Sequence, residues 1–159
     1  MSTPSSQHAP RQMSGFTLIE LMVTLVVASI LLTIAIPAYF TQIRESRRTE
    51  AKTALLDLAG REETLYSTQN LYSTVPTAVG YSGGAFPIQV GSGYYSVNVL
   101  VPNPAAPAAQ PSFIITATPV AGTSQAKDAP CQSFSVDQLG NQTALNSAGG
   151  VNSSQCWGS

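Results

Sequence analysis

The feature that most constrains this chain is an apolar run, FTLIELMVTLVVASILLTIAIPAYF, which extends from Phe16 to Phe40. It contains one charged residue, Glu20, and one proline, Pro37. A helix of that length rises about 37 Å at about 1.5 Å per residue, which is enough to cross a bilayer. A cleaved secretory signal has an apolar region of only about 7–15 residues ending at an A-x-A-like site. The run therefore predicts a retained membrane helix.

Glu20 is the unusual residue of this run. A carboxylate within an apolar helix costs roughly 2.5–3.5 kcal/mol on membrane-insertion scales, so such a residue usually has a partner or a role. Glu20 lies near one end of the run, where lipid headgroups could also reach it. A short polar segment, MSTPSSQHAPRQMSG, precedes the run and ends at Gly15.

The junction Gly15-Phe16-Thr17-Leu18-Ile19-Glu20 resembles the class III signal of type IV prepilins and related pseudopilins. The resemblance implies that a membrane peptidase removes residues 1–15 on the cytoplasmic side. It also implies that the enzyme methylates the new amine of Phe16 and leaves the apolar helix attached. Two further roles follow from the resemblance: Glu20 neutralises the N-terminal amine of a neighbouring subunit, and Pro37 marks a helix kink. A simple proline kink without a role in assembly is an equal alternative for Pro37.

The leader departs from the family in carrying only one basic residue, Arg11. Counted simply, the positive-inside rule favours the opposite orientation, because Arg44, Arg47, Arg48 and Lys52 follow the apolar run. We adopt the family orientation, since the leader must face its peptidase and large domains translocate largely regardless of charge. This predicts an inner-membrane protein with a periplasmic C-terminal domain, which later becomes part of a cell-surface pilus.

Charge is concentrated directly after the apolar run. Only 9% of the residues are charged, with 7 Lys+Arg and 8 Asp+Glu, and ten of these fifteen lie between Arg44 and Glu63. Residues 38–69 keep a helical spacing of apolar positions, which predicts that residues 41–69 form an amphipathic helix with one packed face. The expected packed positions are Tyr39, Phe40, Ile43, Ala51, Ala54, Leu55, Leu58, Leu65 and Tyr66.

The remainder of the chain is rich in Gly, Ser, Thr and Pro and has β character. Residues 70–93 are predicted to form a surface loop, and residues 94–101 alternate as a strand does. The proline-alanine segment 102–111 is predicted to be a linker. Further strands are expected at 113–118 and 132–136, with a turn at 139–141. These strands would form a small antiparallel sheet that packs on the charged half of the helix.

Cys131 and Cys156 are the only cysteines. In an exported chain such a pair predicts a disulfide, which typically contributes about 2–4 kcal/mol to stability. A zinc site or a catalytic cysteine is a poorer explanation, because the only histidine, His8, lies in the leader. We therefore expect no metal site, no cofactor and no catalytic residue.

The second half resembles the PilE-like minor pilins in short, separated matches. The matching residues are Ile115-Thr116-Ala117-Thr118-Pro119, Gln125, Asp128, Cys131, Phe134-Ser135-Val136-Asp137, Gly140 and Cys156-Trp157. The resemblance implies the α+β type IV pilin fold: a long N-terminal helix on a small antiparallel sheet, with a C-terminal loop closed by a disulfide. The expected organisation is a leader (1–15), a transmembrane and filament-core helix (16–40) and a globular domain (41–159).

The function predicted by this resemblance is that of a minor structural subunit that is built into a type IV pilus or primes it, with roles in twitching motility and adhesion. Expected partners are other pilin subunits, the prepilin peptidase/methyltransferase and the assembly platform in the inner membrane. One alternative is a DNA-uptake receptor, but we do not expect nucleic acid as a ligand, because only one cation, Lys127, follows Glu63. Another alternative is a pseudopilin of type II secretion. An enzyme is the least favoured class.

Overall fold

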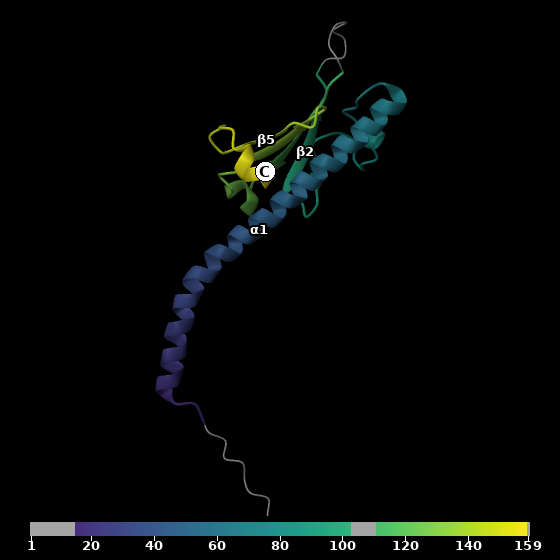
Figure 1. Cartoon of the computed structure of the whole chain (residues 1–159). Helices are drawn as coiled ribbons and strands as arrows, with labels where there is room; N and C mark the ends of the chain where they lie inside the picture. The colour runs from purple at the N-terminus through teal and green to yellow at the C-terminus, as the bar shows by residue number, and fades with distance from the viewer. Residues whose placement is uncertain (1–14, 103–110, 159) are drawn as a thin grey trace, which may run out of the picture. The chain divides into compact units, whose positions relative to one another are not determined.

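One long helix, α1 (Leu18–Gln69), dominates the computed structural model, which describes residues 15–102 and 111–158 (Figure 1). The predicted helix of residues 16–69 is therefore confirmed within two residues at its start. The chain divides into two compact units, residues 1–40 and 41–159. α1 contributes its first part to one unit and the rest to the other.

The first unit presents an exposed apolar helical surface over residues 16–40. Every side chain from 16 to 40 is exposed. An 18-residue window of this helix has a mean hydropathy of 2.5 and is 0% buried. Apolar surface left in water is unfavourable by roughly 25 cal/mol per Å², so this segment requires lipid or protein around it.

Hydroxyl side chains interrupt the apolar surface of the first unit. Thr24, Ser29 and Thr33 each donate a hydrogen bond to the carbonyl three residues earlier, over 2.9, 2.7 and 2.6 Å. An apolar environment offers such groups no other partner. These bonds within the helix therefore make the three hydroxyls compatible with a bilayer or a protein core.

The second unit is the remainder of α1 packed on one face of a five-stranded antiparallel sheet (Figure 1). The strands pair in chain order: β1 (Ile88–Val90), β2 (Tyr95–Leu100), β3 (Ile114–Pro119), β4 (Ser133–Asp137) and β5 (Gln142–Leu145). Three short helical turns complete the unit: η1 (Pro76–Val79), η2 (Ser124–Lys127) and η3 (Ser154–Gly158). The predicted α+β architecture is confirmed.

The core lies between α1 and the inner face of the sheet. α1 contributes side chains three or four positions apart, which occupy a single stripe of the helix. Its buried residues are Ala51, Leu55, Leu58, Glu62 and Leu65. Each fully buried leucine stabilises the fold by about 1.5–3 kcal/mol.

One row of side chains crosses four strands of the inner face and shows how the core is filled. Val97, Ala117, Phe134 and Ala144 are paired in register from β2 to β5, and all are buried. The large ring of Phe134 is flanked by two alanines, so large and small side chains interlock. The ring centroid of Phe134 also lies 6.0 Å from that of Tyr95 in an edge-on arrangement.

Part of the predicted packed face of the helix is wrong. Tyr39 and Phe40 are 64% and 54% exposed, because they belong to the first unit. The buried stripe begins at Ala51, while Ile43 is half-buried. Helical periodicity continues through both units and does not show where the covering sheet starts.

The strands predicted at 94–101, 113–118 and 132–136 are confirmed as β2, β3 and β4. Two further strands were missed. β1 and the turn η1 lie in the segment predicted to be a loop, and β5 follows the predicted turn at 139–141. Both strands are only three or four residues long, so their alternation is too short to recognise. Most of the predicted linker, residues 103–110, lies outside the described residues.

Glu62 is the one charged residue on the buried stripe of α1. Its side chain is fully buried, and Oε2 accepts a hydrogen bond from the backbone N–H of Ser73 over 3.0 Å. Oε1 has no hydrogen-bond partner among the described residues. Burial raises the pKa of Glu62 above its ordinary value of 4.5.

Glu62→Gln is expected to stabilise the globular unit above about pH 5, by the order of 1 kcal/mol, because it removes a buried ionisable group. The folded form holds the Glu62 proton more tightly than the unfolded form. Wild-type stability therefore falls as pH rises through 4.5, and the variant escapes this loss. The measurement is thermal unfolding of the full chain in detergent micelles, followed by the fluorescence of Trp157, the sole tryptophan.

Glu63→Gln is the matched control, because Glu63 is exposed on the same helix. The unfolding midpoints of the two variants should diverge as pH rises from 4 to 7. A lower unfolding midpoint for Glu62→Gln at pH 7 would show that the carboxylate, rather than the carboxylic acid, stabilises the fold.

Candidate functional site

The predicted processing site is an exposed, non-helical segment directly before α1. Gly15 and Phe16 are both exposed, and the helix begins two residues later. The preceding residues of the predicted leader, 1–14, lie outside the described residues. The Gly15–Phe16 bond is therefore flanked on its C-terminal side by open chain, which is the form a peptidase requires.

Glu20 lies in the first turn of α1 and takes part in its cap. The backbone N–H of Glu20 donates to Oγ1 of Thr17 over 3.3 Å, so Thr17 acts as the N-cap. Thr-x-x-Glu is the spacing of a capping box, and a negative charge in the first turn also favours the helix dipole. The local structure thus gives Glu20 a role in starting the helix, in addition to its predicted role in assembly.

Pro37 lies inside α1, and the helix continues through it. Its ring nitrogen cannot donate to the carbonyl of Thr33, so one hydrogen bond of the helical ladder is missing there. The helix kink remains a prediction.

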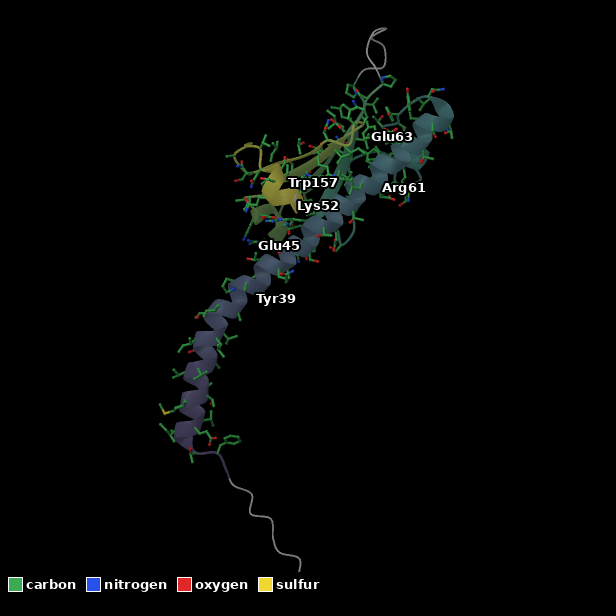
Figure 2. The ribbon with its side chains drawn as sticks, viewed as in Figure 1. Tyr39, Glu45, Lys52, Arg61, Glu63 and Trp157 are labelled. Carbon is green, nitrogen blue, oxygen red and sulfur yellow. A yellow bond between two sulfur atoms is a disulfide. The ribbon has the colours of Figure 1, made fainter. Side chains whose placement is uncertain are left out.

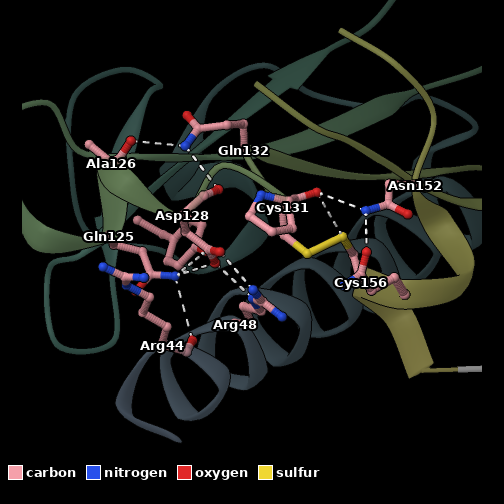
Figure 3. A network of polar contacts seen from close by, with 12 residues as sticks. Arg44, Arg48, Gln125, Ala126, Asp128, Cys131, Gln132, Asn152 and Cys156 are labelled. Atoms are coloured by element: carbon pink, nitrogen blue, oxygen red, sulfur yellow. Dashed lines mark hydrogen bonds and ion pairs between the residues drawn. A yellow bond between two sulfur atoms is a disulfide. The ribbon is translucent and has the colours of Figure 1, made fainter. Parts of the chain in front are cut away.

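A buried ion pair links α1 to the segment around η2 in the second unit (Figure 3). Nε and Nη2 of Arg48 donate to the two carboxylate oxygens of Asp128 over 2.7 and 2.6 Å. Asp128 is 1% exposed. This hydrogen-bonded pairing raises the pKa of Arg48.

Gln125 extends this contact into the core. Its amide nitrogen donates to Asp128 Oδ2 and to the Tyr95 hydroxyl, each over 3.0 Å. Burial raises the pKa of Tyr95 to about 12, so its hydroxyl stays neutral. We call Arg48, Tyr95, Gln125 and Asp128 the clamp, because together they fix the η2 segment on the helix.

The clamp joins two segments that carry cations, the turn of α1 with Arg44 and Arg47 and the η2 turn that ends at Lys127. Arg47 donates to the Ser124 hydroxyl over 2.6 Å, and its guanidinium carbon lies 3.5 Å from the centroid of the Tyr94 ring. Lys127 is exposed at the end of the same η2 turn. The backbone carbonyl of Arg44 faces Gln125 at 3.5 Å.

We call Arg44, Arg47 and Lys127, which lie on the two segments that the clamp joins, the basic cluster. Arg48 adds no net charge to it, since Asp128 neutralises that side chain. Sequence reasoning counted Lys127 as an isolated cation after Glu63. Its proximity to the helix depends on contacts between residues about 80 positions apart, so no local pattern could reveal it.

The predicted disulfide between Cys131 and Cys156 is present directly after the clamp (Figure 3). It holds η3 against the sheet, where Trp157 donates through Nε1 to the carbonyl of Thr143 over 2.9 Å. Nζ of Lys52 in α1 donates to the carbonyl of Trp157 over 3.4 Å. Figure 2 labels both residues in the second unit. The C-terminal turn is therefore tied to both the helix and the sheet.

Within residues 15–102 and 111–158, no three His, Cys, Asp or Glu side chains are grouped as metal ligands would be. The interactions of the side chains described above are apolar contacts, hydrogen bonds and charge pairs.

Comparison with known proteins decides the family. Residues 37–135, more than half of the chain, match the family described as type IV minor pilin ComP, DNA uptake sequence receptor. The chain is a member of the type IV minor pilin family. Residues 10–36 of this minor pilin match the prokaryotic N-terminal methylation motif, and that span includes Gly15, Phe16 and Glu20.

The minor pilin is also similar to a curated protein, the type IV major pilin protein PilA of Myxococcus xanthus (strain DK1622). The two are 36% identical over 77 residues, which is 48% of this chain and 34% of PilA. The chain thus matches about a third of the length of that relative. The predicted resemblance to type IV pilins is confirmed. The residues of the clamp lie inside the span that matches the ComP family, whereas Cys156 and Trp157 lie beyond it.

Asp128→Asn in the minor pilin is expected to destabilise the globular unit by about 3 kcal/mol, because it leaves Arg48 without its buried counter-charge. The measurement is again thermal unfolding of the full chain followed by Trp157 fluorescence. Asp57→Asn is the matched control, since Asp57 pairs with Arg61 at the surface, where both side chains are 46% exposed. If both variants lowered the midpoint of thermal unfolding equally, the ion pair between Arg48 and Asp128 would contribute no more than an ordinary surface pair.

Proposed function

We propose that this minor pilin is a structural subunit that is processed, held in the inner membrane and then assembled into a type IV pilus. Prepilin peptidase would cut between Gly15 and Phe16 and methylate the amine of Phe16. Residues 16–40 would span the membrane, and residues 41–159 would form the periplasmic domain. The observation that carries the proposal is the apolar first part of α1, which is wholly uncovered and begins with a processing motif.

Assembly would exchange lipid for protein around the same apolar surface. Both surroundings are apolar, so the hydrophobic side chains of residues 16–40 remain out of water in each. The assembly platform would extract the helix, and helices of other pilin subunits would then cover it. This role needs no catalytic group, and we propose no enzymatic activity.

Glu20 would make that exchange selective for cleaved subunits through its charge. A carboxylate among packed helices is strongly unfavourable unless a cation neutralises it. The amine of Phe16 in a neighbouring subunit is such a cation, and processing creates it at the start of the same helix. A subunit that is not yet cleaved lacks this amine at Phe16.

Glu20→Gln is expected to reduce the amount of the minor pilin in sheared filaments several-fold while leaving its cleavage largely intact. Quantitative mass spectrometry of filaments and membranes measures both, since the mature peptide should begin at Phe16. Gly15→Leu is the contrasting variant, because a bulky residue there should block cleavage itself. Wild-type incorporation of Glu20→Gln would contradict the assembly role, and a mature N-terminus other than Phe16 would contradict the processing site.

A second candidate function is binding of DNA, and two observations favour it. The matching family is described as a DNA uptake sequence receptor. Arg47, one residue of the basic cluster, also lies over the aromatic ring of Tyr94, and cations combined with a ring suit phosphates and bases. Three cations nevertheless form a small electrostatic footprint, so we expect weak and strongly salt-dependent binding.

Replacing Arg44 and Lys127 together with glutamine is expected to weaken duplex DNA binding at least several-fold. The slope of the logarithm of the binding constant against the logarithm of the salt concentration should become shallower by about 1 for each phosphate that the variant no longer neutralises. Fluorescence anisotropy of labelled duplex DNA with the full chain in detergent micelles measures both. Arg61→Gln is the matched control, since Arg61 lies on another part of α1 and bonds to Asp57. Equal weakening in both variants, or no binding at low salt, would reject DNA as a ligand of the basic cluster.

A further inference from the structure

Thr17 closes the first turn of α1 with two hydrogen bonds. Its side-chain oxygen Oγ1 accepts from the backbone N–H of Glu20 over 3.3 Å. Its backbone carbonyl accepts from the N–H of Leu21 over 3.2 Å. These two contacts are those of an N-cap residue, which stands just outside a helix and satisfies donors of its first turn. Leu18 is accordingly the first helical residue.

The carbonyl oxygens of Gly15 and Phe16 lie outside the hydrogen-bond ladder of α1. In the part of the chain that the structure describes, no backbone N–H donates to either of them. A helical carbonyl accepts from the N–H four residues later. One more turn at this end would therefore pair Gly15 with Ile19 and Phe16 with Glu20. The hydroxyl of Thr17 competes with that arrangement directly, because it already holds the N–H of Glu20.

The peptide bond between Gly15 and Phe16 is the one that the proposed processing cuts. Hydrolysis breaks its C–N bond: the carbonyl carbon of Gly15 takes the hydroxyl of water, and the nitrogen of Phe16 takes the proton. A carbonyl that is bonded inside a helical turn is not open to this attack. Proteolysis of a bond that opens and closes rapidly follows the fraction of molecules in which the bond is open. A helix that extended over Gly15 would therefore be cut more slowly.

The stability of α1 does not by itself determine where the helix begins. Helix formation is cooperative, so adding a turn to a helix of 52 residues requires no new nucleus. Two residues oppose such an extension. Thr17 caps the helix, and Gly15 is of the poorest helix-forming type apart from proline. A Cβ at Gly15 would meet nothing within 4 Å, so the fold itself gives no steric reason for glycine there.

We propose that Thr17 is a positioning residue for processing: its hydroxyl makes α1 begin at Leu18 and keeps the carbonyl of Gly15 open to the peptidase. The inference rests on the proposed function, because it concerns the cleavage that this function requires. Thr17 acts through the backbone of α1. Its donor is the backbone N–H of Glu20, so Glu20→Gln retains the cap and should still be cleaved.

The first test measures cleavage of the full-length precursor in detergent micelles by purified prepilin peptidase. Mass spectrometry follows the cleaved fraction with time. Thr17→Ala removes the cap and introduces the strongest helix former, so its initial rate is expected to fall about fivefold. Thr17→Ser and Thr17→Asn keep a capping side chain, and their rates are expected to stay within about twofold of the wild type.

Thr17→Val separates the cap from the shape of the side chain. Valine has nearly the shape of threonine but no hydroxyl, whereas asparagine differs in shape and caps well. We expect Thr17→Val to be cut about threefold more slowly than Thr17→Asn. Thr24→Val is the matched control, because the Thr24 hydroxyl bonds to a carbonyl within the helix, and its rate should be unchanged. Fast cleavage of Thr17→Val with slow cleavage of Thr17→Asn would overturn the inference.

The second test observes the start of the helix at the cleaved bond itself. Gly15–Phe16 is the only Gly-Phe pair in the chain. Labelling glycine carbonyls with ¹³C and phenylalanine nitrogens with ¹⁵N therefore gives an NMR signal from this bond alone in the full precursor. The Gly15 carbonyl shift should move toward its helical value in Thr17→Ala and stay unchanged in Thr17→Asn. Slower cleavage of Thr17→Ala with an unchanged Gly15 signal would overturn the inference.

The readouts separate this inference from the proposed function. A wild-type chain that is not cut, or is cut elsewhere than before Phe16, would reject the proposed processing and the inference together. Wild-type cleavage before Phe16, with equal rates for Thr17→Ala and Thr17→Val, would reject the role of the cap alone. Thr17 belongs to the first unit, so the fluorescence of Trp157 in the second unit should be unchanged in every variant.

Discussion

The ion pair between Arg48 and Asp128 is the contact on which the rest of the globular unit's surface depends. Asp128 is almost completely buried and accepts three hydrogen bonds, two from Arg48 and one from Gln125. Removing two charges from water is unfavourable, and only such complete pairing offsets it. Because the pair joins α1 to the segment between β3 and β4, it determines where η2 lies on the helix.

The clamp also lies at the start of the disulfide loop. Cys131 follows Asp128 by three residues, and its backbone N–H bonds to the carbonyl of Asp128 over 3.2 Å. Gln132 then bonds to the carbonyls of Ala126 and Asp128. The loop between Cys131 and Cys156 therefore begins from a fixed point on the helix, and η3 returns its far end to the same helix through Lys52.

Several features could be predicted from the sequence because they depend on local chemistry. The length and composition of residues 16–40 indicate the apolar helix. The alternation at 94–101 puts Tyr95, Val97, Val99 and Val101 on one face, and the first three of these are buried. Two cysteines in an exported chain indicate the disulfide. β1 and β5 were missed because they are short and take their stability from neighbouring strands.

The distribution of charged side chains on the globular unit could not be predicted from the sequence, for a different reason. A run of mixed charges between Arg44 and Glu63 looks like an ordinary solvated helix face. The fold gives these charges different neighbours: Arg47 and the carbonyl of Arg44 contact η2, whereas Glu45, Glu50 and Asp57 line an open groove beside the segment before β2. Such a separation depends on which side of the helix the sheet occupies, and the chain order alone does not specify that.

The hydroxyls of Thr24, Ser29 and Thr33 give the first part of α1 a property that its hydropathy does not describe. Each is bonded to a carbonyl of its own helix, so the segment carries its hydrogen-bond partners with it. A transfer between two apolar surroundings then breaks none of these bonds. The segment can therefore change its neighbours without breaking the hydrogen bonds of these three hydroxyls.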